Sequence, residues 1–389
     1  MTHTASKTRR AVGIALGVAA IMAVLVTPPF AAAEHRSHPG TDPVQAQLDL
    51  LTGVDRVPGA LAQVRNRHGR AVTMTAGTAE LGTDRPMVGS DGQFRVASVT
   101  KTFVATAVLW LVAKDRVRLD EPIATYLPGV VRGTGDGADI DGRHITVRQL
   151  LQHTSGVPDY TEHLDFSQLE GPVEASELVR LALSNKPDFT PGQGWHYSNT
   201  GFIIAGMLVE RLTGKDIGTA VTDLVIRPAG LGDTYWPPAG ERRIRGPHAH
   251  NYLLDEDDPE GPLVDVTEYE PSWAGASGAM VSTPADLNQF WRKLLDGHLL
   301  PSRQLAQMRA TVPAPGIGDG AGYGLGLARL PLSCGGYAWG HGGGLAGAGV
   351  SNVSVRTETG REATVYITAQ TGKQAANRLL NTVDVALCT

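Results

Sequence analysis

Two residues three positions apart, Ser98 and Lys101, have the types and the spacing needed for nucleophilic catalysis. They open an apolar stretch that we expect to be helical, and a spacing of three on a helix places both side chains on one face. A serine hydroxyl is a weak nucleophile until a base takes its proton, and a desolvated lysine has a lowered pKa that suits this task. A Ser-x-x-Lys string alone is weak evidence, because a capping serine followed by a solvated lysine gives the same pattern.

A second candidate element is the tripeptide Tyr197-Ser198-Asn199, which precedes another apolar helical pattern. Placed against Ser98 and Lys101, Tyr197 can act as general base, with its phenolate stabilised by the lysine cation. The Asn199 amide can donate to a substrate carbonyl and accept from a substrate N–H group. The alternative is a buried tyrosine whose hydroxyl is merely hydrogen-bonded, and the tripeptide alone favours that alternative.

A third candidate element is His341-Gly342-Gly343, at the end of a predicted strand. A histidine at a strand edge can hydrogen-bond the tyrosine or the reacting group, and the glycines let a substrate approach the backbone closely. Taken alone, a histidine in a glycine-rich loop is more often structural.

The elements that must position these residues follow from periodicity and turn residues. Residues 99–114 are apolar on most faces, which predicts a buried helix that begins at Ser98. A helix over residues 45–54 precedes two β-rich runs within residues 60–76, and short helical patterns fill residues 119–296. Strand patterns return near the C-terminus at residues 322–327, 337–341, 349–355 and 364–368, and a last helix spans residues 375–387.

This order of elements predicts an α+β fold. An antiparallel sheet is formed by the N-terminal and C-terminal segments and flanked by helices, a mostly helical lobe at about residues 119–296 is inserted, and the active site lies between them. Residues 45–389 would form this catalytic domain, because about 345 residues are too many for one compact core without a second lobe.

The three elements also occur in the order and approximate spacing of a known family. The sequence resembles the serine β-lactamase and penicillin-recognising superfamily, and within it the branch of class C β-lactamases and secreted D-alanyl-D-alanine carboxypeptidases. The likeness covers residues 44–389 and rests on the strings FRVASVTK (94–101), LLQHTSG (150–156), TPG (190–192), YSN (197–199), ASGAM (276–280) and YGLGL (323–327).

The resemblance implies a role for each candidate residue. Ser98 would be the acylated nucleophile, Lys101 its activator and Tyr197 the general base, while Asn199 would position the acyl amide. His341 would hold the place of the lysine or histidine in the family's third motif. The backbone N–H groups of Ser98 and Gly344 would form the oxyanion hole, and Trp273 would line the cleft wall, so that the predicted substrate-binding residues are Asn199, Trp273, Gly342, Gly343 and Gly344. No cofactor and no metal are implied, since the other histidines lack a companion ligand set.

One departure from the family pattern concerns the anchor for a substrate's terminal carboxylate. The carboxypeptidase has two hydroxyl residues in its third motif and an arginine directly after the YGLGL string, whereas this chain has Gly342, Gly344 and Ala328. Arg329 is the next residue, but a one-residue shift in a strand turns a side chain to the other face, so Arg329 replaces the anchor only if a bulge intervenes.

We therefore expect a serine hydrolase that forms a covalent acyl-enzyme on amide or ester bonds, closest to a D-alanyl-D-alanine carboxypeptidase-like peptidase of altered specificity. The alternatives are an esterase, a D-amino-acid amidase or β-lactamase, and a penicillin-binding sensor that hardly turns over. Expected partners are small peptide, peptidoglycan-derived or ester substrates, with β-lactams as acylating inhibitors.

The N-terminus carries the pattern of an export signal. Lys7, Arg9 and Arg10 precede a 16-residue apolar run that ends at Val26, and the triplet at residues 31–33 is all alanine. This order predicts a signal peptide over residues 1–33, then a flexible leader over residues 34–44, and a secreted, extracellular protein. An uncleaved membrane anchor is the alternative, but the run is shorter than the roughly 20 residues that a spanning helix needs.

Charge and cysteine content agree with export. The net charge is −5 at pH 7 and becomes −8 without the three signal-peptide cations, which argues against nucleic acid or an anionic membrane as partner. We expect a monomer without stable membrane insertion. In an oxidising compartment Cys334 and Cys388 are expected to form a disulfide, which would contribute about 4 kcal/mol in the chain-entropy model, and two free buried thiols are the alternative.

Overall fold

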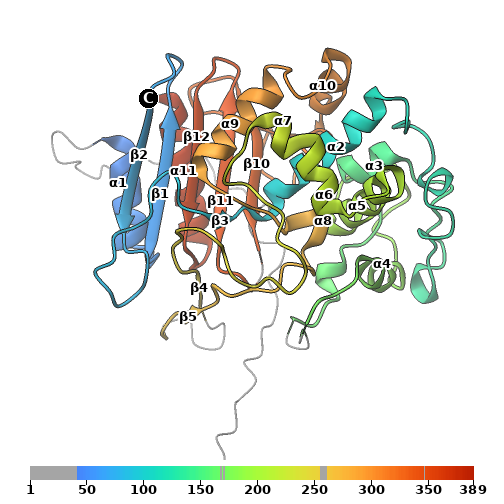
Figure 1. Ribbon diagram of the computed structural model, residues 1–389, viewed down its shortest axis with the longest axis horizontal. Helices are drawn as coiled ribbons and strands as arrows, with labels where there is room; N and C mark the ends of the chain where they lie inside the picture. The colour runs from blue at the N-terminus through green and yellow to red at the C-terminus, as the bar shows by residue number, and fades with distance from the viewer. Residues whose placement is uncertain (1–41, 167–168, 170, 255–260, 346) are drawn as a thin grey trace, which may run out of the picture.

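A computed structural model of the chain describes residues 42–166, 169, 171–254, 261–345 and 347–389 (Figure 1). The predicted signal peptide, residues 1–33, and all but the last three residues of the predicted leader lie outside the described residues. Among the residues that the structure describes, no helix combines the length and the apolar character needed to cross a bilayer.

One large antiparallel sheet is built from both ends of the described chain, which confirms the predicted α+β architecture. Its strands lie in the order β2-β1-β12-β11-β10-β9-β8-β7. The N-terminal hairpin joins the C-terminal strands through β1 and β12, where Ala60 pairs with Ile367 and Arg65 with Glu362. Figure 1 shows these blue and red strands side by side. The strands are β1 (Gly59–Arg65), β2 (Ala71–Gly77), β7 (Val312–Pro313), β8 (Gly322–Tyr323), β9 (Ala328–Pro331), β10 (Tyr337–Gly344), β11 (Ser351–Thr357) and β12 (Glu362–Ile367).

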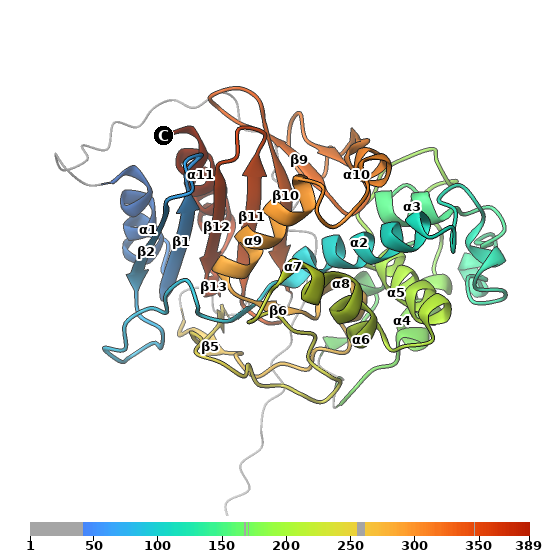
Figure 2. The same ribbon diagram turned by 45° about the horizontal axis from the view of Figure 1, so that its top comes forward.

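The two faces of the sheet bury different residues because side chains alternate along a strand. Ala60 and Ala62 face helices α1 (Pro43–Gly53) and α11 (Lys373–Cys388). Leu61 belongs to the other core, which lies towards α9 (Pro284–Leu295) and the helical region. Figure 2 shows α9 crossing in front of the sheet and α11 behind it. α1 begins at Pro43, two residues earlier than predicted, because Asp42 caps it by accepting from the Val44 N–H group.

The middle of the chain is helical, with only short strands. The helices are α2 (Thr100–Ala113), α3 (Val147–Gln152), α4 (Ala175–Leu183), α5 (Asn199–Thr213), α6 (Ile217–Val221), α7 (Arg227–Ala229), α8 (Gly275–Gly278) and α10 (Ser302–Arg309). Single helical turns are η1 (Ala97–Val99), η2 (Ile123–Thr125), η3 (Gly135–Gly137) and η4 (Tyr160–Glu162), and η6 (Thr222–Ile226) is a π-helical turn. Two-residue strands form the small sheets β13-β4-β5 and β3-β6, namely β3 (Phe94–Arg95), β4 (Tyr252–Leu253), β5 (Val264–Asp265), β6 (Val281–Ser282) and β13 (Ala369–Gln370). The boundaries of the inserted lobe stay a prediction.

Helix α2 is the centre of the helical region, as its apolar sequence predicts. Its residues from Thr100 to Leu109 are all buried, and its last turn reaches the surface. The helix contacts α5, α8 and α10. A helix buried on all faces is held rigidly, so its first turn is a fixed platform for side chains.

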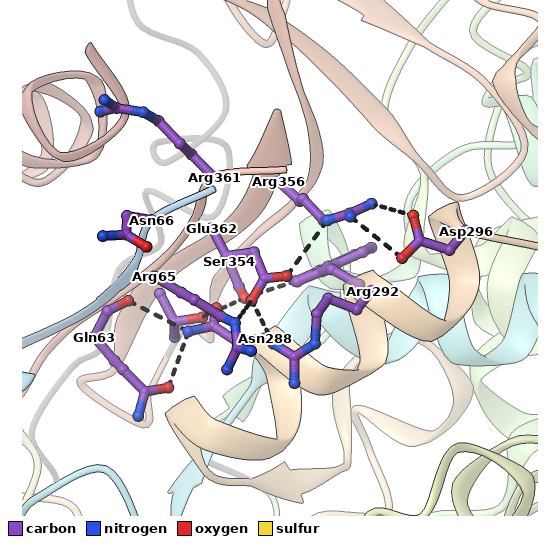
Figure 3. Close-up of polar contacts among 12 residues, drawn as sticks. Gln63, Arg65, Asn66, Asn288, Arg292, Asp296, Ser354, Arg356, Arg361 and Glu362 are labelled. Atoms are coloured by element: carbon purple, nitrogen blue, oxygen red, sulfur yellow. Dashed lines mark hydrogen bonds and ion pairs between the residues drawn. The ribbon is translucent and has the colours of Figure 1, made fainter. Parts of the chain in front are cut away.

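Two features tie the sheet to its helices. The predicted disulfide between Cys334 and Cys388 is present and joins the turn after β9 to the end of α11. On the opposite face, the fully buried carboxylate of Glu362 pairs with Arg292 of α9 at 2.5 Å and with Arg356 of β11 at 3.3 Å (Figure 3). Arg65 of β1 approaches the same carboxylate at 4.0 Å. Helix α9 and strands β1 and β11 therefore share the one buried charge of Glu362 on β12.

Candidate active site

Ser98 lies in the turn η1, directly before α2 and at the end of the large sheet. Ala97 has a left-handed backbone conformation, with φ of +50°, which costs energy in a residue other than glycine. The turn is held by the hydrogen bond from the Val96 N–H group to the Met280 carbonyl. Ser98 is partly exposed while both of its neighbours are buried, so this strained turn presents the hydroxyl at the surface of an otherwise closed core.

Lys101 contacts Ser98 directly, as the helical spacing predicts. Its ammonium nitrogen lies 2.9 Å from Ser98 Oγ, and it donates to Asn199 Oδ1 at 2.7 Å and to the Ser277 carbonyl at 2.8 Å. All three partners are neutral, and the side chain is fully buried. Burial lowers the pKa of Lys101 to about 7, and the negative charge of Asp159 acts in the opposite direction.

Asn199 is placed by the first turn of α5 and is held between two charged residues. Its Nδ2 donates to Asp159 Oδ2 at 2.7 Å, and its backbone N–H group donates to the same oxygen at 3.2 Å. Its Oδ1 accepts from Lys101, so both ends of the amide are engaged within the protein. The predicted contacts of Asn199 with substrate would use the second Nδ2 hydrogen, and they stay a prediction.

Tyr197 lies next to Lys101 and Ser98, as predicted. The lysine nitrogen is 4.9 Å from the centre of the tyrosine ring. The hydroxyl oxygen is buried, and among the described residues it completes no hydrogen bond of normal geometry. Burial raises the pKa of Tyr197, and the nearby Ser98 hydroxyl offsets this only in part. The phenol is therefore protonated at neutral pH.

His341 does not hydrogen-bond Tyr197, one of the two partners suggested by the sequence, and its contact with the reacting group stays a prediction. Its Nε2 accepts from the Tyr323 hydroxyl at 2.8 Å, and its Nδ1 donates to the Gly342 carbonyl at 2.5 Å. The centres of the His341 and Tyr197 rings are 6.4 Å apart. Burial, with a smaller effect of the Lys101 charge, lowers the pKa of His341 to about 3, so the imidazole is neutral. Among the described residues, its side-chain hydrogen-bond partner is Tyr323.

The glycines of the third motif let β10 lie directly against the Ser98 turn. A Cβ atom at Gly343 would lie 2.2 Å from the Val96 carbonyl oxygen. This is too close for two nonbonded atoms, and a backbone oxygen cannot rotate away as the end of a flexible side chain can. A side chain at this position would push β10 away from η1. Gly342 is buried and Gly344 is partly exposed, and Gly344 pairs with Ser351 in the sheet. Their predicted substrate contacts stay predictions.

The position of the missing carboxylate anchor is well defined. Ala328 pairs with Gly340 and Arg329 with Trp339, so the β9 register continues without a bulge. Ala328 is fully buried. The Arg329 guanidinium instead stacks over the ring of Tyr337 at 4.4 Å. Arg329 therefore does not take the place of an arginine at position 328.

Trp273 is packed in the interior of the helical region. Its ring makes edge contacts with Phe166 and Tyr269, and only 4% of the residue is exposed. Its carbonyl accepts from the Tyr160 hydroxyl at 2.6 Å. This surrounding leaves little of the ring for a cleft wall, and contact with substrate stays a prediction.

Four residues around the site were not predicted to take part in it. Ser277 supplies a carbonyl to Lys101, Asp159 holds Asn199, and Tyr323 holds His341. His153 stacks on Tyr197 with ring centres 4.3 Å apart, and its Nδ1 accepts from the Ser198 N–H group. Three of the four lie in the strings LLQHTSG, ASGAM and YGLGL. Asp159 follows the first string by three residues, and nothing in the sequence indicates what its carboxylate contacts.

Comparisons with known proteins agree with this geometry. The family model described as Beta-lactamase matches residues 48–387. Penicillin-binding protein 4 of Amycolatopsis lactamdurans is 32% identical over 66% of this chain and 64% of that protein. Esterase EstB of Burkholderia gladioli is 35% identical over 53% of this chain and 54% of that protein. The chain thus spans less than two thirds of the length of these curated relatives.

A solved structure covers more of the chain. The D-stereospecific amidohydrolase from Streptomyces sp. is 40% identical and superposes with a TM-score of 0.77, over 87% of this chain and 97% of that structure. Proteins named for different activities are thus similar to this chain, so its substrate must be argued from the site itself.

Proposed function

This chain belongs to the Beta-lactamase family and is a serine hydrolase, and from that premise we propose that it cleaves amide bonds of D-configured acyl groups whose leaving group carries no carboxylate. The reaction passes through a covalent acyl-enzyme on Ser98. The D configuration is supported by the similarity to the amidohydrolase from Streptomyces sp., which is described as D-stereospecific.

The observation that carries this proposal is the lost carboxylate anchor. A free carboxylate that enters a cleft must replace its hydration with charge-assisted donors, each worth about 1.5 to 3 kcal/mol. Ala328, Gly342 and Gly344 supply no side-chain donor, and Arg329 stacks on Tyr337 instead. An amide or ester leaving group needs no such donors, so the carboxypeptidase activity expected from the resemblance becomes the weaker candidate.

The chemistry follows from the contacts of Lys101. Neutral Lys101 takes the proton from Ser98 Oγ, which attacks the substrate carbonyl carbon, and the N–H groups of Ser98 and Gly344 receive the developing oxyanion. The protonated Tyr197 hydroxyl gives a proton to the departing nitrogen, and the C–N bond breaks. Water then attacks the ester carbonyl carbon and gives a proton to the Tyr197 phenolate. The bond to Ser98 Oγ breaks, Lys101 returns its proton to that oxygen, and the acid is released. In this proposal Lys101 is the base and Tyr197 the acid, because the Tyr197 pKa is raised.

An esterase is the second candidate. It is supported by the similarity to Esterase EstB and by the same lack of a carboxylate anchor, since an ester leaving group does not depend on a proton donor as an amide nitrogen does. The arrangement of Ser98, Lys101 and Tyr197 speaks against a sensor that acylates without turnover. β-lactams are expected to acylate Ser98. Peptidoglycan-derived peptides are expected to be weaker substrates where their leaving group carries a terminal carboxylate.

The proposal includes the cellular context predicted from the sequence. An exported, extracellular enzyme that meets small peptides or amides accords with the disulfide between Cys334 and Cys388. A single chain contains all the groups invoked above, which supports a monomer as the working unit.

The test compares three versions of one substrate. A D-alanyl-D-alanine peptide, its C-terminal amide and its methyl ester are incubated with the enzyme, and an L-configured amide serves as the stereochemical control. We expect kcat/KM for the amide and the ester to equal or exceed that for the free acid, and Arg329→Ala to change nothing. A strong preference for the free acid that disappears in Arg329→Ala would show an ordinary carboxypeptidase with a relocated anchor.

A further inference from the structure

The buried carboxylate of Asp159 is linked to the catalytic Lys101 through one residue, Asn199. Asp159 is 5% exposed, and among the described residues it makes no ion pair. Its Oδ1 accepts from the backbone N–H group and the hydroxyl of Thr161, both at 2.9 Å. Its Oδ2 accepts from the backbone N–H group and the side-chain Nδ2 of Asn199. Four donors therefore hold the carboxylate in one orientation.

This carboxylate decides which way the Asn199 amide faces. Burial raises the pKa of Asp159, while the hydrogen bonds from Thr161 and Asn199 and the charge of Lys101 favour the ionised form. An ionised carboxylate only accepts hydrogen bonds, so Asn199 turns its Nδ2 towards Asp159 and its Oδ1 towards Lys101. Among the described residues, that oxygen is one of three acceptors within hydrogen-bond distance of the Lys101 nitrogen, and another of the three is Ser98 Oγ. The loop that carries Asp159 is fixed as well, since the Tyr160 N–H group donates to Thr200 Oγ1 at the start of α5.

We propose that Asp159 is a positioning residue for acylation: through the Asn199 amide it holds the Lys101 nitrogen at Ser98 and adjusts the pH at which that nitrogen becomes a base. Asp159 touches neither Ser98 nor the reacting atoms. The inference rests on the proposed acyl-enzyme chemistry and not on the substrate class.

Several titratable groups surround Asp159, Asn199 and Lys101, and apart from the exchanged residues themselves they are the same in every variant below. Lys101 faces Asp159, Tyr197, His153 and His341, and both imidazoles have lowered pKa values and are neutral. Asp159 faces Lys101 together with Tyr160, Tyr197, Glu162 and His196. Within this set the negative charge of Asp159 favours the cationic form of Lys101.

The first test is Asp159→Asn, measured as the pH dependence of kcat/KM on a p-nitrophenyl ester. Thr161 donates twice to Oδ1, so the new amide keeps its oxygen there and turns its nitrogen to Asn199. Asn199 must then flip and present its own nitrogen to Lys101. The cationic form of Lys101 loses both an acceptor and a counter-charge, so we expect the acid limb of the profile to move to lower pH by about one unit. The plateau should fall about tenfold or more, because Lys101 is less well placed.

The second test exchanges the two groups in the double variant Asp159→Asn, Asn199→Asp. The carboxylate then contacts Lys101 directly, while the amide at position 159 bonds both Thr161 and the new carboxylate. The acid limb should move to higher pH than in the wild type, opposite to the single variant. This opposite shift is not expected from a merely structural defect, and it decides the matter where Asp159→Asn alone folds poorly.

The matched control is Asp286→Asn. Asp286 also accepts from a backbone N–H group, that of Asp233, and from a threonine hydroxyl, that of Thr234, but it lies at the start of α9. We expect its pH profile to match the wild type. An unmoved acid limb in Asp159→Asn, or shifts in the same direction in the single and double variants, would overturn the inference. Ester hydrolysis that persists in Ser98→Ala would instead overturn the proposed function.

Discussion

Two fully buried charged residues, Lys101 and Glu362, have different surroundings. Lys101 at the start of α2 has only neutral groups in contact with its nitrogen, and its nearest carboxylate, Asp159, acts through an intervening amide. Glu362 on β12 is equally buried but touches Arg292 and Arg356 directly (Figure 3). Burial disfavours the charged form of both groups, since it lowers the pKa of Lys101 and raises that of Glu362.

The difference separates a catalytic charge from a structural one. Direct ion pairs offset part of the desolvation cost of the Glu362 carboxylate and favour its charged form, and the pair with Arg292 holds α9 on the sheet. The Lys101 ammonium lacks such pairs, and with a pKa of about 7 it is about half deprotonated near pH 7. A lysine that is neutral half of the time near pH 7 can accept a proton from an adjacent hydroxyl.

The largest effect is expected at Ser98, whose hydroxyl Lys101 deprotonates in the proposed mechanism. In Ser98→Ala we expect no acyl-enzyme and no hydrolysis of any substrate, because among the described residues no other serine hydroxyl contacts a buried lysine. Incubation with a fluorescent penicillin followed by peptide mass spectrometry should place the adduct on Ser98. An adduct on another residue would remove Ser98 as the nucleophile.

Tyr197→Phe tests whether catalysis needs Tyr197 as proton donor in addition to Lys101 as base. The change removes only a hydroxyl that has no normal hydrogen bond, so we expect the fold to be unchanged. Amide turnover should fall at least about a hundredfold, the usual range for a positioned acid or base. Stopped-flow and steady-state kinetics measure this loss. Near-normal turnover of the amide would take Tyr197 out of the mechanism.

Several features of the fold and the site could be predicted from the sequence. The Ser98 and Lys101 contact follows from helical spacing, and the sheet between the two termini follows from the order of strand patterns. The disulfide follows from an even cysteine count and the predicted export. Each of these depends on local periodicity or on a simple pairing rule.

The partners of buried polar groups were the part that the sequence left open. His341 bonds Tyr323, which lies 18 residues away, and Asp159 bonds Asn199, which lies 40 residues away. Such pairs depend on how strands and loops meet in space, and no periodicity encodes that. The short strand β9 was also missed, because only four residues pair and one of them is a proline.

Lys101→Met tests the lowered pKa of Lys101 through the pH dependence of the unfolding free energy. The folded pKa of about 7 lies below the ordinary value of 10.5, so between these values the unfolded chain binds more protons than the folded one. Stability conferred by this position therefore rises with pH across that window. Relative to Lys101→Met, the wild type should gain about 1 to 3 kcal/mol of unfolding free energy between pH 7 and pH 10. Urea denaturation of both proteins at the two pH values measures this, and a constant difference would contradict the lowered pKa.

The smallest effect is expected at Glu362, the structural charge. Glu362→Gln keeps the shape of the side chain but leaves Arg65, Arg292 and Arg356 without their shared carboxylate. Removing one partner of a fully buried ion pair costs about 3 to 5 kcal/mol, because the other charge stays buried. Here the arginine side chains keep 32%, 27% and 15% of their exposure, and Arg356 retains Asp296, so water and a second carboxylate compensate. We therefore expect a loss of about 1 to 2 kcal/mol in unfolding free energy.

The activity of Glu362→Gln distinguishes the two kinds of buried charge. Glu362 contacts α9, β1 and β11, none of which carries Ser98, Lys101 or Tyr197. The kcat per folded molecule and the acid limb of its pH profile should therefore match the wild type, while the denaturation midpoint falls. Arg243→Gln, which removes an exposed pair with Glu268, is the control for loss of a surface ion pair and should cost less than about 1 kcal/mol. A shift of the acid limb in Glu362→Gln would mean that the structural cluster also sets the charge of Lys101, and the division between the two sites would not hold.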